Sequence, residues 1–170
     1  MDRIGLVTLR AEAEDDLRVA AEAAAAATDR LRQGGASGHE SCAYQLVRFF
    51  NIVDQMGLRV AKAFENHIDD ERGWHAELVH RLSIVVPGVR PALYQPPVLP
   101  ALRDLRGFRH VVTHAYDLEL DQARLALVLK HAEEASCLLP GMVTAFFDAV
   151  SDKLADRSRI EHLESRIEDE

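Results

Sequence analysis

Reactive side chains are concentrated between Arg109 and Asp117, where the chain reads RHVVTHAYD. The stretch supplies a permanent cation, two imidazoles, a hydroxyl and a phenol. On a helix with about 100° between successive residues, its polar positions fall on one face. The apolar positions, among them Phe108, Val111 and Val112, fall on the opposite face. One face can therefore pack on other helices while the other face presents the reactive groups.

These residue types suit transesterification of a phosphodiester. A neutral histidine can take the proton of a ribose 2′-hydroxyl, and a protonated one can donate to the leaving oxygen. The unperturbed pKa of histidine, about 6.5, keeps both forms accessible. An arginine can hold the scissile phosphate and offset charge in the transition state. The pattern makes Arg109 and His114 candidates for these roles, with His110, Thr113 and Asp117 in support, and the chemistry needs no metal ion or cofactor.

The two predicted catalytic residues diverge on the helix. Arg109 and His114 point about 140° apart around the axis, which suits a single phosphate poorly. Two copies facing each other across a twofold axis would line a shared groove with two arginines and two histidines. We therefore expect a homodimer.

Other interpretations of the same stretch remain open. An amphipathic helix whose polar face simply meets solvent or ion pairs has this pattern too. His110 and His114, four residues apart, with Asp117 three further on, also have a spacing that can hold a divalent metal, so a metal-binding bundle is an alternative. Arg103 and Arg106, one to two turns earlier, either extend the track for the RNA phosphates or are ordinary solvated charges.

Length and composition limit the class of protein. The chain has 170 residues, 48% hydrophobic and 28% charged, which is typical of one soluble globular domain and excludes a disordered or collagen-like chain. Its net charge of −8 disfavours a generic polyanion binder. Residues 81–110, however, hold five arginines and a single acidic residue, Asp104. Any contact with RNA is therefore expected in this basic segment.

Helical periodicity dominates, and no segment alternates with the period of two that is typical of strands. Gly34-Gly35-Ala36 ends a first helix, and Ser37 with Glu40 predicts a capping box at the start of the second. Asp121 is expected to cap a fifth helix, which Pro140-Gly141 kinks or ends. The predicted helices span residues 9–33, 37 to about 68, 74–83, 100 to about 116, and 122 onward.

The remaining segments complete an all-α prediction. The connector from Pro87 to Pro100 holds five of the six prolines, too many for a helix and unsuited to a sheet. Residues 156–170 alternate in charge sign and predict a solvated helical tail that is available to a partner. We expect one helical bundle of five to six helices over residues 1–170, with no internal repeat.

Cys42 and Cys137 are too few for a disulfide framework and are expected to be small core residues in a reducing cytosol. Tyr44 and Tyr94 are expected to be packing residues. No run approaches the roughly twenty apolar residues of a membrane span, and the N-terminus has no apolar core of signal-peptide length. We expect a cytoplasmic protein that makes no membrane contact.

The motif Arg109-x4-His114-x-Tyr116 resembles the R-x4-H-x-Y signature of HepT-type toxins, which belong to the HEPN superfamily. The position in the fourth predicted helix and the small all-α chain agree with that family. The resemblance implies a HEPN-like dimeric, metal-independent endoribonuclease with Arg109 and His114 as catalytic residues. It also implies a minimal nucleotidyltransferase as the cognate antitoxin, which transfers AMP from ATP to Tyr116.

Two points of the resemblance leave alternatives open. The family commonly has Asn or Asp after the motif arginine, whereas this chain has His110, which either takes over that polar role or alters the site. A HEPN-like subunit that binds a nucleotidyltransferase and has no nuclease activity is the second functional alternative.

Overall fold

The chain folds into an all-α bundle, as predicted, in a computed structural model that describes residues 2–65, 74–114 and 120–168. Within these ranges the structure has five α-helices, one short 3₁₀ helix and no strand. The elements are α1 Arg3–Gln33, α2 Gly35–Phe64, α3 Trp74–Leu82, η1 Pro96–Val98, α4 Leu99–His114 and α5 Gln122–Glu168. None of these helices combines the length and the apolar character that a bilayer crossing requires.

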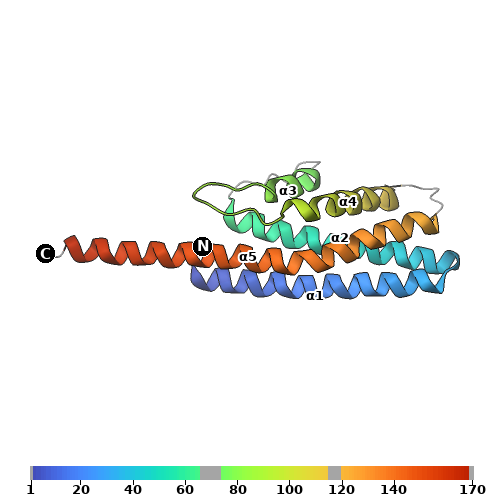
Figure 1. The fold of residues 1–170 in the computed structure, drawn as a ribbon, viewed down its shortest axis with the longest axis horizontal. Helices are drawn as coiled ribbons and strands as arrows, with labels where there is room; N and C mark the ends of the chain where they lie inside the picture. Colours follow the sequence, from blue (N-terminus) through green and yellow to red (C-terminus); the bar gives the residue numbers. More distant parts are fainter. Residues whose placement is uncertain (1, 66–73, 115–119, 169–170) are drawn as a thin grey trace.

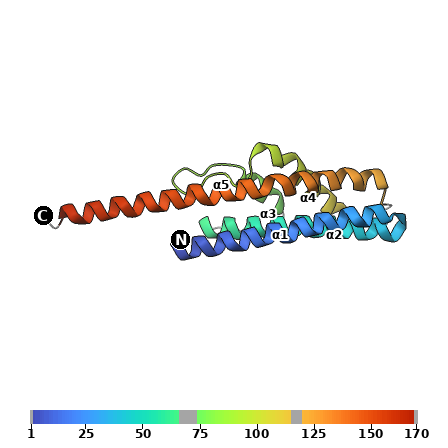
Figure 2. The same cartoon turned by 60° about the horizontal axis from the view of Figure 1, so that its bottom comes forward.

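Three long helices form the body of the molecule (Figure 1). α1 and α2 run antiparallel, and α5 packs along both of them (Figures 1 and 2). α4 packs on α2 and α5, and α3 packs on α2 and α4, on the side away from α1. The C-terminal part of α5 extends beyond the end of the bundle (Figure 1), so the segment expected as a charged helical tail is helical as far as Glu168.

The connection between α1 and α2 is tighter than the sequence suggested. Gly34 and Gly35 both adopt φ of +68°, a left-handed conformation that glycine alone adopts at little cost. This allows α2 to begin at Gly35, with no side-chain hydrogen bond at its cap. The predicted capping box is therefore wrong, because Ser37 and Glu40 lie inside the helix.

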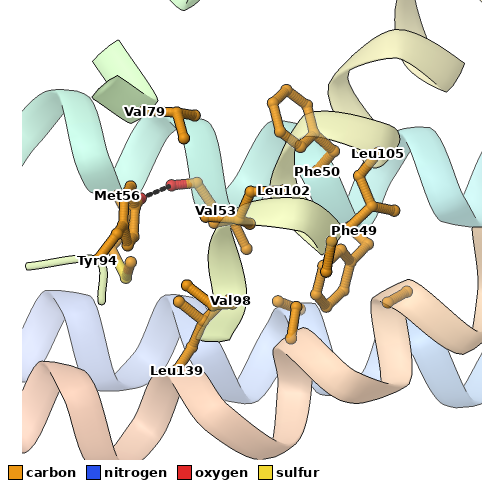
Figure 3. Close-up of a cluster of buried hydrophobic side chains, with 14 of the residues drawn as sticks. Phe49, Phe50, Val53, Met56, Val79, Tyr94, Val98, Leu102, Leu105 and Leu139 are labelled. Carbon is orange, nitrogen blue, oxygen red and sulfur yellow. Dashed lines mark hydrogen bonds between the residues drawn. The ribbon is translucent and has the colours of Figure 1, made fainter. Parts of the chain in front are cut away.

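α2 and α4 share the core that positions the candidate site. Figure 3 shows Phe49, Phe50 and Val53 of α2 facing Leu102 and Leu105 of α4. All five side chains are at most 2% exposed. The close-up also places Tyr94 of the connector in this cluster, so its predicted packing role is confirmed.

The register of α4 differs from the expected one. Leu102, Leu105 and Phe108 are buried. On a helical wheel, the centre of the face that they form lies about 100° or more from Val111. Val111 is therefore 46% exposed, and its expected place on the packed face is wrong. Arg109 falls at the edge of the packed face, and its side chain is only 27% exposed. Tyr116, where this helix was expected to end, lies outside the described residues.

α5 continues through Pro140 as one helix. A proline inside a helix removes a hydrogen bond and crowds the preceding turn, at a cost of about 3 kcal/mol. Leu139, Val143 and Phe146 are buried on both sides of the proline, and their packing offsets this cost. The interpretation that Pro140-Gly141 ends the helix is therefore wrong.

Two other single-residue expectations need correction. Cys42 is buried, as expected, and burial raises the pKa of its thiol to about 11. Cys137 is exposed, because it falls between the core positions Ala135 and Leu139 on the outer face of α5. Tyr44 is 64% exposed and is not a core residue.

A buried arginine holds the proline-rich connector against the bundle. Arg90 is fully buried and pairs with Glu65 at the C-terminal end of α2. Its guanidinium also donates to the backbone carbonyls of Ile84, Pro91 and Arg81 at 3.0–3.2 Å. Arg81 of α3 donates to the same Glu65 carboxylate at 2.7 Å. One carboxylate therefore joins α2, α3 and the connector that leads into α4.

We expect Glu65→Gln to destabilise the fold in a pH-dependent way. Burial alone would raise the pKa of Glu65, but the hydrogen bonds from Arg90 and Arg81 outweigh burial and lower it. The stabilisation that the ionised Glu65 provides is therefore fully present above the ordinary glutamate pKa of about 4.3. It is lost as the pH falls through the lower pKa of Glu65 in the folded protein. Breaking this buried pair should lower the free energy of unfolding by about 3 kcal/mol near pH 7.

Urea denaturation followed by circular dichroism near pH 7 and near pH 3 measures this effect. Glu22→Gln is the control, because the Glu22–Arg18 pair is exposed and contributes little. The same loss at both pH values would contradict a role for the charge.

Candidate active site

Four of the six residues predicted to act in or beside the reaction lie in the last two turns of α4. Arg109, His110, Thr113 and His114 are described, with His110, Thr113 and His114 exposed. Tyr116 and Asp117 lie outside the described residues, so their predicted roles stay predictions. The last two turns of α4 thus carry a guanidinium, two imidazoles and a hydroxyl.

Arg109 is held between an acidic and an aromatic side chain of α2. Its Nη1 lies 3.6 Å from Oδ2 of Asp54, whose side chain is 2% exposed. Its Cζ lies 5.9 Å from the centroid of the Phe50 ring, within the range of a cation–π contact. The guanidinium is therefore anchored on its inner side and reached by solvent on its outer side.

Residues of α2 and of the connector pack closely around Asp54. The Tyr94 hydroxyl donates to the carbonyl of Val53 at 3.2 Å. Burial, followed by the negative charge of Asp54, raises the pKa of the Tyr94 phenol, which therefore stays protonated. Gly57 makes room for this ring, because a Cβ there would lie 2.6 Å from the phenol oxygen. Gly57 therefore marks a close packing contact between α2 and the connector.

The hydrogen bonds of His114 fix which ring nitrogen carries the proton. Nδ1 lies 2.9 Å from the carbonyl oxygen of His110, an acceptor only, so Nδ1 must be the donor. The Thr113 hydroxyl donates to the carbonyl of Arg109 at 2.8 Å and can accept from the same Nδ1, which is 2.8 Å away. A neutral His114 thus carries its proton on Nδ1 and keeps the lone pair on Nε2, which is the form that a general base needs.

The second histidine stacks on the first. The His110 and His114 rings have centroids 4.5 Å apart with an interplanar angle of 30°. This contact limits the rotation of His114 about its side chain. His110 and Thr113, the predicted supporting residues, thus both contact His114. The His110 ring stacks on the His114 ring, and the Thr113 hydroxyl lies within hydrogen-bond distance of its Nδ1.

Arg109 and His114 are not brought together within one chain. Arg109 turns towards α2, whereas His114 lies exposed beside His110. The helical wheel predicts that these two side chains point in different directions, and the contacts of the described residues agree with that prediction.

The two arginines that precede the motif occupy different environments. Arg103 is exposed, whereas Arg106 is half-buried. Between them, Asp104 lies 3.1 Å from Nδ1 of His131 on α5, so this acidic side chain has a partner on the neighbouring helix. Of the two, Arg103 is the more accessible to an RNA phosphate.

Within the described ranges, no three His, Cys, Asp or Glu side chains gather as metal ligands would. The predicted alternative of His110, His114 and Asp117 includes a residue outside those ranges. In the described part of this set, Nδ1 of His114 is already engaged with a backbone carbonyl. His114 therefore offers only Nε2 to a ligand while Nδ1 keeps this bond.

The comparisons with known proteins identify the family. A family model described as HepT-like protein matches residues 41–150, well over half of the chain. The chain belongs to the HepT-like family. No curated protein and no solved structure matches it significantly.

The match of the HepT-like family covers the whole candidate site. It runs from the first turns of α2 to the middle of α5, so Asp54, Tyr94 and the α4 motif all lie inside it. α1 and the extended end of α5 lie outside it. Family membership supports a HEPN-type toxin, in agreement with the resemblance of the motif.

Asp54 is the site residue that sequence reasoning missed. It lies among Phe50, Val53 and Gly57 on the buried face of α2, so an acidic residue interrupts an apolar pattern. That interruption is the signal by which it could have been found, since buried carboxylates are rare unless they are paired.

We expect Gly57→Ala to lower the free energy of unfolding by about 2 kcal/mol through overpacking. The added Cβ would lie 2.6 Å from the Tyr94 hydroxyl and 2.9 Å from Leu82 Cδ1. Gly141→Ala is the matched control, because a Cβ there meets nothing within 4 Å. That variant should gain up to about 1 kcal/mol from helix propensity. Urea denaturation compares the two, and equal effects would contradict the close contact at Gly57.

Proposed function

We propose that this HepT-like protein is a metal-independent endoribonuclease toxin of a toxin–antitoxin pair. The observation that carries the proposal is the arrangement of His114, whose Nδ1 is engaged as a donor while Nε2 remains available as a base. Arg109, five residues earlier on the same helix, supplies the cation that a phosphate requires. The family match adds a HEPN-type toxin as the class of protein.

The proposed reaction is an attack of the ribose 2′-hydroxyl on the neighbouring phosphate. Nε2 of His114 takes the hydroxyl proton while Arg109 holds the phosphate and offsets its developing charge. The bond from phosphorus to the 5′-oxygen then breaks, and an imidazolium donates a proton to that leaving oxygen. The products are a 2′,3′-cyclic phosphate and a 5′-hydroxyl end.

A second chain completes the proposed site. One face of α4 is exposed along Gly107, His110, Val111 and His114, and a Cβ at Gly107 would meet nothing within 4 Å. Two copies that face each other across a twofold axis would line a shared groove with two arginines and two histidines. The homodimer thus supplies both an acid and a base to one phosphate.

Regulation is proposed to act on Tyr116. A minimal nucleotidyltransferase antitoxin would transfer AMP from ATP to its phenol oxygen. Tyr116 follows His114 by two residues, so the added phosphate would place negative charge beside the groove that binds RNA. Repulsion and steric blocking would then exclude the RNA phosphates.

We expect Arg109→Ala and His114→Ala each to lower RNA cleavage about a thousandfold, because each removes one part of transition-state stabilisation. Cleavage of a labelled RNA by the wild-type protein should persist in EDTA and leave 2′,3′-cyclic phosphate ends. A requirement for magnesium, or products with 3′-hydroxyl ends, would contradict the mechanism. So would toxicity on overexpression that survives either substitution.

A mixture of the two inactive variants tests the shared groove. If one site uses Arg109 from one chain and His114 from the other, chains exchanged between Arg109→Ala and His114→Ala dimers should regain up to about a quarter of wild-type activity. Chains that carry both substitutions serve as the control and should restore nothing. No recovery in a confirmed mixed dimer would place the whole site within one chain.

We expect the intact mass of the protein to rise by whole AMP units after co-expression with the cognate nucleotidyltransferase. Tyr116→Phe lacks the acceptor oxygen, so it should abolish the rise, and Tyr44→Phe is a control because Tyr44 is an exposed tyrosine on α2. RNA cleavage by the modified wild-type protein should fall in step with the modified fraction. A mass increase that persists in Tyr116→Phe would contradict the assignment.

A further inference from the structure

Two charged side chains are buried in the described part of the chain, Asp54 and Arg90. Arg90 has a structural role that its contacts account for, since it pairs with Glu65 and donates to three backbone carbonyls. Asp54 differs, because it lies in the middle of α2 and forms an ion pair with Arg109 of the candidate site. This ion pair places the charge of Asp54 at that site.

The contact between the two residues restrains the guanidinium on one side only. Asp54 approaches one terminal nitrogen of Arg109 at 3.6 Å, and the Phe50 ring lies 5.9 Å from the guanidinium carbon. A guanidinium has five N–H donors, so pairing at one nitrogen leaves others for a ligand. The Arg109 side chain keeps 27% of its surface exposed, whereas Asp54 keeps 2%. The carboxylate thus anchors the arginine from within and leaves its outer edge accessible.

Packing alone does not explain an aspartate at this position. A buried carboxylate loses its hydration, whereas an apolar side chain would pack favourably beside Phe50 and Val53. Tyr94 next to it stays neutral, because burial and the charge of Asp54 raise the pKa of its phenol. The ion pair with Arg109 is a contact that uses the charge of Asp54.

We propose that Asp54 is a positioning residue, whose carboxylate fixes the Arg109 guanidinium at the edge of α4 so that its remaining N–H groups meet the scissile phosphate. This inference rests on the proposed ribonuclease function for its catalytic consequence. The positioning itself is a property of the free protein and can be measured without RNA.

Asp54→Asn tests the catalytic consequence, because it keeps the size of the side chain and removes its charge. It should lower kcat/KM for RNA about tenfold to hundredfold, the loss typical of a misplaced catalytic group. Urea denaturation measures how far loss of the pair lowers the stability of the variant, and cleavage is compared under conditions in which both proteins are folded. In an Arg109→Ala background the same substitution should change the residual rate less than about twofold, because there is no guanidinium left to position.

Asp148→Asn is the matched control. Asp148 of α5 also pairs with an arginine of another helix, Arg10 of α1, at 2.6 Å, and neither residue belongs to the motif. The control should cleave RNA at the wild-type rate. A loss of cleavage by Asp54→Asn that persists undiminished in the Arg109→Ala background would overturn the proposal, because Asp54 would then act by some route other than Arg109.

Nitrogen NMR of the arginine side chains tests the positioning role of Asp54 independently of the proposed ribonuclease function. The Nη signals of Arg109, assigned with Arg109→Lys, should show slow rotation of the guanidinium in the wild type and fast rotation in Asp54→Asn. Fast rotation already in the wild type would overturn the positioning role. Slow rotation released by Asp54→Asn, in a protein that cuts no RNA, would support positioning and reject the ribonuclease.

Discussion

The packing of α4 against α2 is the constraint on which the site depends. Leu102, Leu105 and Phe108 are buried at a spacing that fixes the rotation of α4 about its axis. Because a helix is rigid, this rotation also fixes where every other α4 side chain points. It sets Arg109 at the edge of the interface beside Asp54 and leaves the two histidines exposed. The candidate site is therefore a consequence of hydrophobic packing elsewhere on the same helix.

Buried charges link that packing to the connector that precedes α4. Glu65 joins α2 to Arg81 of α3 and to Arg90 of the connector. Further along the connector, the Tyr94 ring packs over Gly57, and its hydroxyl bonds to α2 beside Asp54. Each of these contacts holds the connector to α2, and the connector leads through η1 directly into α4. The position of Arg109 thus depends on ionic and steric contacts well outside the motif.

Because Arg109 and His114 point in different directions, we propose that a second copy binds the outer face of α4. One chain presents the Arg109 guanidinium and the His114 imidazole in different directions, so in the proposed ribonuclease a single copy makes an incomplete site for a phosphate. Val111 is exposed on the outer face of α4, and a Cβ at Gly107 would meet nothing within 4 Å. A second copy on that surface would join the two halves of the chemistry without any change in the fold of either chain.

Much of the fold and part of the site could be predicted from the sequence. Local rules were sufficient for the helical class, for the fourth helix and for the R-x4-H motif, because residue type and spacing along one helix decide them. They failed at Ser37 and Pro140, where two glycines in the α1–α2 turn and core packing along α5 override local preferences.

Only the tertiary structure decided which side of α4 packs, and with it the half-burial of Arg109 and the pairing with Asp54. Asp54 and Arg109 are far apart in the chain, and no periodicity within either helix records the angle at which the two helices meet. The sequence by itself determined which chemical groups the fourth helix carries. The packing between helices decided which of those groups is anchored and which is exposed, because that depends on the summed burial of side chains from several segments at once.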